Sequence, residues 1–453
     1  MRVSRLLLVL LIASAFLSVF KFRLLGLNAN LSQLLAVLMT LAWANWHMRG
    51  GTDTRTNRNL ITSAVILYAA TNLFSSALFA PDKVWSIRGA ADVSTFVLIY
   101  LIARRFVVKL NAFDNAFYLL KLFNFVSVAF GLFSLLYFWL LGGRSFIGVV
   151  TGQFESGFPS IRALSFEPNF FAQITAVVSC FYLADIMLRR SKRSAKLVFF
   201  CFLTPAIIFS YTRGVYVALL AAIAAMVLVN VRKAKYLLRR LAPPVVVILV
   251  TLALFSAVSS TFYRDVFGAV LQRIANITDF RQGSGAIRYA LYVIGLMGFL
   301  SGPLFGHGTL SADTVTINRI TGQLGYISGT RGWLTGAWIQ ALNDTGIVGF
   351  LSMLFLFAAP LFENFRVFKQ TSNDRNLRSI ALGFLGGNIV LLVACQISSS
   401  LWFSFPWIYW GINAAFIHLV TNGEYDAKRA VKKEHHNHHN GEYSKQPLRI
   451  QKA

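Results

Sequence analysis

Residues 197–230 read LVFFCFLTPAIIFSYTRGVYVALLAAIAAMVLVN, and their only charge is Arg213. The run is too long for one bilayer crossing, which takes about 20 apolar residues. If it forms one helix, every later basic cluster moves to the opposite side of a membrane, against the rule that basic residues collect in cytoplasmic loops. The stretch therefore predicts two spans, 197–211 and 214–231, with an extracytoplasmic turn at Arg213 in which Gly214 supplies backbone freedom.

The composition of the whole chain agrees with a membrane protein. Of its 453 residues, 56% are hydrophobic and only 13% are charged, which is too apolar for an ordinary soluble chain. Bilayer-length apolar runs recur without the alternation of barrel strands, so we predict an all-α polytopic integral membrane protein with about twelve transmembrane helices. The predicted spans are 6–20, 29–47, 59–80, 89–103, 115–141, 165–187, 197–211, 214–231, 242–262, 334–360, 380–399 and 402–420.

Basic clusters fall in alternate gaps between these spans, which predicts that both termini are cytoplasmic. The net charge of +26 is thereby explained by cytoplasmic loops, without nucleic acid as a partner. A membrane domain covers residues 1–420. Its largest extracytoplasmic loop, 261–333, precedes the tenth span and holds a short interfacial helix at 287–300, and long loops of this kind are usually functional. The tail, 421–453, is basic and poor in apolar residues, so we expect it to be disordered and cytoplasmic.

Arginine is unexpectedly frequent on the predicted outer face, where the orientation rule gives it no role. Some of these residues have ordinary explanations as helix caps or solvated loop charges. Arg213 and Arg288 lie against apolar sequence, where an unpaired charge costs several kcal/mol, so they need an anion. A guanidinium fork matches phosphate oxygens, which suggests a lipid-linked pyrophosphate presented from the outer leaflet. The outer arginines are Arg144, Arg162, Arg213, Arg264, Arg273, Arg281, Arg288, Arg319 and Arg331.

Two further side chains are candidates for proton transfer. Glu167 stands in LSFEPNFFAQ, where it serves either as a helix-start carboxylate or as a catalytic base, with Asn169 close behind. His307, in GPLFGHG, is either a turn residue or a proton acceptor. The candidate catalytic residues are therefore Arg213, Arg288, Glu167 and His307, and the candidate substrate-binding residues are Arg162, Arg213, Arg288, Arg331 and Asn169.

Three stretches, in this order and spacing, resemble motifs of the O-antigen ligase and O-antigen polymerase superfamily of bacterial membrane glycosyltransferases. They are SYTRGVYVALL, which is similar to a Ser-Arg-Gly segment at an outer helix turn, GAIRYALYVIGLMGFLSGPLFGHGTL, and WIQALNDTGIVGFLSMLFL. The motif similarity covers roughly residues 165–360, and the twelve-helix layout covers nearly the whole chain.

The resemblance implies transfer of a glycan from undecaprenyl pyrophosphate to an acceptor hydroxyl on the outer face of the bacterial inner membrane. It implies inversion at the sugar, and neither a metal, a cofactor nor a nucleotide sugar. Arg213 and Arg288 match the functional arginines of the family, which would bind the pyrophosphate and stabilise it as a leaving group. The partners implied are the lipid-linked donor and acceptor glycans, the bilayer, a chain-length regulator and a flippase.

One departure from the family pattern bears on which reaction is catalysed. Ligases of this group typically carry His-Asn about eleven residues before the glycine that ends the last motif, and Thr335 and Gly336 stand there in this chain. Polymerisation of repeat units is therefore favoured over ligation, and the base is left open among Glu167, His307 and Asp344, the last of which also fits a structural charge. A polymer ligase is the alternative, and a secondary transporter or flippase of lipid-linked oligosaccharides is the alternative of another class.

Overall fold

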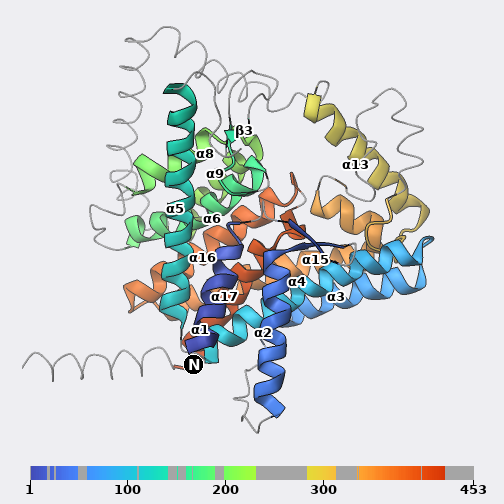
Figure 1. Cartoon of the computed structure of the whole chain (residues 1–453), viewed down its shortest axis with the longest axis horizontal. Coiled ribbons are helices and arrows are strands. Elements are labelled where there is room, and N and C mark those ends of the chain that lie inside the picture. Colours follow the sequence, from blue (N-terminus) through green and yellow to red (C-terminus); the bar gives the residue numbers. More distant parts are fainter. Residues whose placement is uncertain are drawn as a thin grey trace, which may run out of the picture.

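The structure of the protein is a computed structural model, and it is mostly helical (Figure 1). It describes residues 2–17, 21–24, 27–48, 59–109, 112–140, 150–151, 160–165, 167–188, 198–230, 283–312, 334, 336–398 and 400–423. The helices are α1 (Arg2–Ser14), α2 (Leu31–Met48), α3 (Leu60–Leu78), α4 (Lys83–Lys109), α5 (Phe113–Leu140), α6 (Pro168–Leu188), η1 (Val198–Leu203), α8 (Thr204–Ile208), α9 (Arg213–Val229), α13 (Gly283–Ser301), α15 (Ala337–Gln370), α16 (Arg375–Ala394), η5 (Ser400–Trp402) and α17 (Ser404–Thr421).

The predicted spans coincide with these helices. Every predicted span overlaps a described helix except 242–262, which lies outside the described residues. Within the described ranges, five helices are long and apolar enough to cross a membrane, and they are α3, α5, α6, α15 and α16. Shorter apolar helices lie in α1, α2, α9 and α13. The total of twelve crossings stays a prediction, as does the extent of the 261–333 loop, of which the structure describes only α13 and the residues after it to 312.

Two short pairs of antiparallel strands depart from the all-α prediction. Strand β1 (Lys21–Leu24) pairs with β2 (Leu27–Asn30), with Lys21 opposite Asn30. Strand β3 (Val150–Thr151) pairs with β4 (Ser160–Ile161) in the same way. Both pairs lie in links between helices, where backbone N–H and C=O groups lack helical partners and bond to one another instead.

The span predicted at 197–211 is not one continuous α-helix. Residues Val198–Leu203 form a π-helix, and α8 follows with Pro205 in its first turn. Proline has no N–H to donate and is favoured in the first turn of a helix, where that N–H has no helical partner. The side chain of Thr204 donates to the carbonyl of Phe199 at 2.9 Å. This bond gives a partner to one of the carbonyls near the junction between the π-helix and α8.

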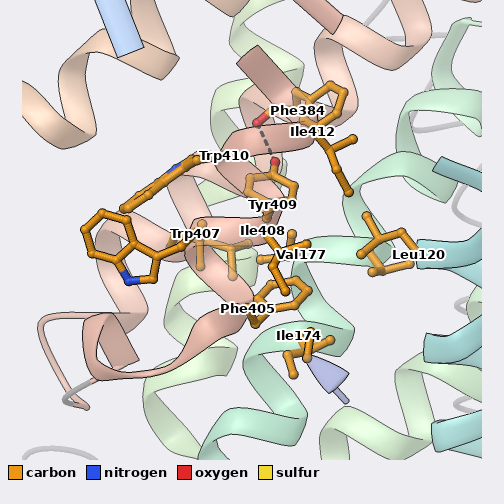
Figure 2. Close-up of a cluster of buried hydrophobic side chains, with 14 of the residues drawn as sticks. Leu120, Ile174, Val177, Phe384, Phe405, Trp407, Ile408, Tyr409, Trp410 and Ile412 are labelled. Carbon is orange, nitrogen blue, oxygen red and sulfur yellow. Dashed lines mark hydrogen bonds between the residues drawn. The ribbon is translucent and has the colours of Figure 1, made fainter. Parts of the chain in front are cut away.

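The centre of the molecule is formed by α6, α16 and α17. Nearly all side chains of these three helices are buried, as expected of helices surrounded by others. Their aromatic residues interlock, and Figure 2 shows Tyr409 donating to the backbone carbonyl of Phe384, a bond of 3.0 Å. Gly386 of α16 lies where a Cβ would come within 2.5 Å of the sulfur of Met226, so a small residue brings α16 close to α9, as is common between membrane helices.

The helix ends fall into two groups, as alternating spans require. At one end of the molecule the start of α3 meets the second half of α17, since Asn59 donates to the carbonyl of Ala414 at 3.3 Å. At the other end, the last turn of α3 meets the first part of α15, since Ser75 donates to the carbonyl of Asp344 at 2.7 Å. The start of α9 and the end of α16 also lie together, with Gly214 against Ile397. Which group of ends faces the cytoplasm stays a prediction from the basic clusters.

Candidate functional site

Arg213 opens helix α9, directly after a tight reversal of the chain. Helix α8 ends at Ile208, and Tyr211 in the turn adopts a left-handed φ of 52°. The hydroxyl of Tyr216, on the first turn of α9, donates to the carbonyl of Ile208 at 2.5 Å and so ties the two helices together. Arg213 is half-buried. A cation at a helix N-terminus is disfavoured by the helix dipole, so the position itself favours an anionic partner for Arg213.

The role predicted for Gly214 is corrected by this geometry. The left-handed backbone of the turn belongs to Tyr211, and Gly214 lies inside α9. A Cβ on Gly214 would lie 2.5 Å from Cδ1 of Ile397. Gly214 is therefore small because the chain after α16 approaches it closely, and its freedom of backbone conformation is not used.

That approaching segment is residues 395–398, Cys-Gln-Ile-Ser, which we name the CQIS turn. It is hydrogen-bonded to the start of α15, because the backbone N–H of Ala337 donates to the carbonyl of Cys395 at 2.9 Å. The backbone N–H of Trp338 donates to the side-chain oxygen of Gln396 at 3.2 Å. The CQIS turn thus fixes the start of α15 on one side and touches the start of α9, through Ile397, on the other.

Helix α13, which carries Arg288, contacts the same turn through Tyr292. The hydroxyl of Tyr292, one helical turn after Arg288, donates to the carbonyl of Gln396 at 2.5 Å. Residues four apart lie on one helix face, so Arg288 shares the face that α13 turns toward the CQIS turn. Burial raises the pKa of the Tyr292 phenol, and the positive charge of Arg288 partly offsets this rise, as expected of neighbours. Arg288 is itself half-buried.

The segment before α6 lies beside the turn that precedes Arg213. The backbone N–H of Ile161 donates to the carbonyl of Phe209 at 3.1 Å, and half-buried Arg162 follows directly. Glu167 is exposed, and its carbonyl accepts from the N–H of Phe171 at 3.3 Å, which starts α6. Both interpretations of the Glu167 side chain are therefore still open.

Helix α6 also meets the CQIS turn within its first two turns. The side chain of Gln173 donates to the sulfur of Cys395 at 3.7 Å, and half-buried Asn169 lies one turn earlier on the same helix. Four helices that are distant in sequence, α6, α9, α13 and α15, therefore contact residues 395–398, and the first three carry predicted site residues. Arg331 lies outside the described residues.

His307 is placed at the other end of α13. Its Nε2 atom lies 2.9 Å from the carbonyl oxygen of Gly298 and 2.8 Å from Oγ of Ser301. Arg288 and Ser301 are thirteen residues apart on one helix, which is about 20 Å at 1.5 Å per residue. The structure thus ties His307 to the C-terminal end of its own helix and does not bring it to the CQIS turn.

The GPLFGHG loop, residues 302–308, is bonded to a kink in α15. Gly346 has φ 61° and ψ −159° within that helix, and a Cβ on it would lie 2.4 Å from the carbonyl carbon of Leu304. Across this contact the N–H of Ile347 donates to the carbonyl of Pro303 at 2.9 Å, and the N–H of Gly308 donates to the carbonyl of Asp344 at 2.7 Å. Two of the three sequence motifs are therefore partners in one packed joint.

Asp344 holds this joint together with its carboxylate. One oxygen accepts from the N–H of Leu310 and from the side chain of Gln340, both at 2.7 Å. The other accepts from the side chain of Asn343 at 2.8 Å, and Asp344 is 2% exposed. Of the two interpretations of Asp344, the geometry favours the structural charge, because its oxygens are occupied by donors of the protein.

Sequence reasoning missed two sets of residues that build this region. Asn72, Ser75 and Ser76 of α3 bond the loop after α13, for example through the N–H of Thr309, which donates to the hydroxyl of Ser76 at 2.9 Å. Polar residues spaced three and four apart within an apolar span were the available signal. The CQIS turn had a weaker signal, the polar run that closes the span at 380–399.

The arrangement of Arg213, Arg288, the glycine loop and the α15 kink falls within one region of the chain that has known relatives. Residues 197–354 match the family model described as O-antigen ligase. This part of the chain is therefore similar to the O-antigen ligase family. The match covers about a third of the chain and includes Arg213, Arg288, His307 and Asp344, whereas Arg162, Glu167 and Asn169 precede it. No curated protein matches the chain.

The similarity of residues 197–354 to the O-antigen ligase family gives the coarse function. It indicates glycosyl transfer of the ligase or polymerase type, with lipid-linked glycans as substrates, in a membrane protein with several apolar helices. Within the described ranges, no three His, Cys, Asp or Glu side chains lie together as a metal site requires.

The contact between Gly214 and the CQIS turn leads to a first prediction. Gly214→Ala should lower the free energy of unfolding by about 1–3 kcal/mol, because the new methyl group overpacks against Ile397. Adding Ile397→Ala should restore most of this loss, since the two sites then fit again. Thermal melting of the four proteins of this double-mutant cycle in detergent measures the effect. Strictly additive melting shifts would contradict the contact.

Proposed function

We propose that the protein is a polysaccharide polymerase that joins undecaprenyl-pyrophosphate-linked oligosaccharide repeat units on the outer face of the bacterial inner membrane. The product would be an O-antigen, capsule or exopolysaccharide. The observation that carries the proposal is that α9 and α13, the helices that bear Arg213 and Arg288, both contact the CQIS turn. Both arginines lie within the residues that match the O-antigen ligase family.

In the proposed site, two guanidinium groups suit a pyrophosphate better than a single phosphate. Each presents a planar fork that bonds two phosphate oxygens at once. Arg213 adds the N-terminal N–H groups and the dipole of α9, which also attract anions. Because both residues are half-buried, their attraction for an anion is less screened by water than at an open surface.

In the proposed reaction an acceptor hydroxyl attacks the anomeric carbon of the donor glycan from the face opposite the pyrophosphate. The new glycosidic bond forms while the bond between that carbon and the pyrophosphate oxygen breaks, with inversion. The electron pair of the broken bond leaves on undecaprenyl pyrophosphate, where Arg213 and Arg288 stabilise the developing charge. Glu167 accepts the proton of the attacking hydroxyl, and Arg162 and Asn169 bind the glycan near the start of α6. Arg331 keeps its predicted role in substrate binding.

The surroundings of Gly336 favour polymerase over ligase. A Cβ on Gly336 would lie 2.6 Å from the carbonyl oxygen of Gln396 and 2.7 Å from the hydroxyl of Tyr292. In the His-Asn pattern of the ligases, asparagine stands at the position of Gly336. In this chain the CQIS turn occupies the space, so an asparagine side chain has no room there.

The direct test supplies the full-length protein in membranes with undecaprenyl-pyrophosphate-linked single repeats and no nucleotide sugar. Gel analysis of the lipid-linked glycan should show a ladder that grows by whole repeats. Intact single repeats after incubation with folded protein would reject the polymerase. Transfer of preformed polymer to a lipid or protein acceptor would then identify a ligase, and movement of the lipid-linked glycan across the bilayer without a new bond would identify a flippase.

The proposed base can be separated from the alternative histidine. Glu167→Gln should lower the rate of ladder growth by about 10²- to 10⁴-fold, the usual contribution of a general base. His307→Gln should change it by less than about tenfold, because His307 contacts Gly298 and Ser301, and Ser301 lies about 20 Å along α13 from Arg288. A larger loss in His307→Gln than in Glu167→Gln, at equal folded yield, would reverse the assignment.

A further inference from the structure

A second basic site lies at the end of the molecule away from the CQIS turn. A cavity of about 180 Å³ opens between α2 and α4. One water needs roughly 10–15 Å³ measured in this way, so the cavity has room for a group of several heavy atoms. It is lined mainly by Thr40 and Trp43 of α2 and by Leu98, Leu101, Arg104 and Arg105 of α4.

Both arginines of the cavity are held in place by neighbouring side chains. Arg104 is 5% exposed, and its Nη1 donates to the hydroxyl of Thr62 at 2.8 Å. The guanidinium carbon of Arg105 lies 4.6 Å from the centre of the Trp43 ring, a favourable cation–π distance. Side chains that are already ordered lose little entropy when a ligand arrives.

The wall of the cavity continues into an apolar surface. Leu98 and Leu101 line the cavity itself. On α2, Val37 lies one turn before Thr40 and is 45% exposed, and Leu41 lies one turn after Val37 and is 62% exposed. An apolar face on a membrane helix is covered by lipid chains or by protein. A charged recess joined to an apolar face suits a molecule with an anionic head and a hydrocarbon tail.

We propose that this cavity binds the phosphate headgroup of an anionic phospholipid whose acyl chains lie along α2. The described lining residues contribute two cationic side chains and no carboxylate. The guanidinium fork fits phosphate oxygens, and the positive charge of two adjacent arginines attracts an anionic headgroup. Basic pockets between membrane helices on the cytoplasmic side commonly hold anionic headgroups, and this is the end that the basic clusters predict to be cytoplasmic.

Native mass spectrometry of the purified full-length protein tests the site, with dioleoylphosphatidylglycerol and dioleoylphosphatidylcholine as probes at equal concentration. Wild-type protein should retain phosphatidylglycerol in preference. Arg105→Gln should weaken its association about fivefold, the typical contribution of one basic residue near an anionic lipid. Lys109→Gln is the matched control, because it removes the same charge from the exposed last residue of α4, outside the cavity. Trp43→Leu keeps every charge and should also weaken the association of phosphatidylglycerol, because it removes the ring that holds Arg105 in place.

Three outcomes would overturn the proposal. Equal retention of the two lipids would show that headgroup charge is not recognised. An equal loss of phosphatidylglycerol association in Lys109→Gln and Arg105→Gln would show that basic residues attract the lipid in general, without a specific site. Displacement of phosphatidylglycerol by millimolar inorganic phosphate would assign the cavity to free phosphate. Thermal melting of each variant verifies that the proteins compared are folded.

Discussion

Membranes that contain the Arg213→Ala variant should extend the glycan ladder about 100- to 1000-fold more slowly than wild type, the usual loss when one preorganised donor to a developing charge is removed. Arg288→Ala should give a loss of similar size, because both helices meet at the CQIS turn. Arg213→Lys should recover only part of the rate, since an ammonium keeps the charge and loses the fork. Single-turnover ladder formation at saturating lipid-linked donor measures all three.

The matched control for these variants is Arg366→Ala, which removes an exposed arginine from the second half of α15, far along that helix from its start at the CQIS turn. Its ladder should equal that of wild type. Wild-type rates in Arg213→Ala and Arg288→Ala, with normal membrane insertion, would remove both arginines from the reaction. Loss of folded protein is distinguished from loss of catalysis by thermal melting of each variant.

The largest effect on stability should come from Gly346→Ala. A non-glycine residue at its dihedral angles, which are open essentially to glycine alone, costs about 1–3 kcal/mol. Overpacking adds about 1–3 kcal/mol, because the backbone of Leu304 and Phe305 lies against Gly346 and cannot rotate away as a side chain would. The joint between the GPLFGHG loop and α15 should open, which lowers the melting temperature and the yield of folded protein in detergent.

Gly423 offers the matched control, because its φ is 68° and nothing lies within 4 Å of the Cβ that alanine would add. Gly423→Ala therefore carries the conformational cost alone, about 1–2 kcal/mol. If Gly346→Ala melted no lower than Gly423→Ala, the close approach of the loop to α15 would be wrong.

The positions of the helices followed from the sequence because each depends on local composition. The span predicted at 115–141 is α5 at Phe113–Leu140, and that at 165–187 is α6 at Pro168–Leu188. Apolar runs of bilayer length between basic clusters leave few alternatives. The break at Pro205 was visible in the sequence and was not used, since the orientation argument needed only the number of crossings.

The candidate site was accessible only in part. Arg213 and Arg288 stood out because charge is rare in apolar sequence. The CQIS turn, which both of their helices contact, did not stand out in the sequence. Its contacts, of Gln396 with Tyr292 and of Ile397 with Gly214, join residues more than 100 positions apart. No local sequence pattern marks such pairs. The same holds for Asp344, whose carboxylate resembles that of a base until its three donors are seen.

The CQIS turn also determines at which stage of protein synthesis the proposed pyrophosphate site can assemble. The ribosome finishes Arg213 and Arg288 long before it reaches residues 395–398, and membrane helices enter the bilayer in chain order. Until α16 has been inserted, the starts of α9 and α15 and the Tyr292 face of α13 have no common support. In the proposed orientation, a growing chain therefore carries Arg213 and Arg288 at the outer leaflet before the proposed pyrophosphate site has assembled, and the last helices to be inserted complete that site.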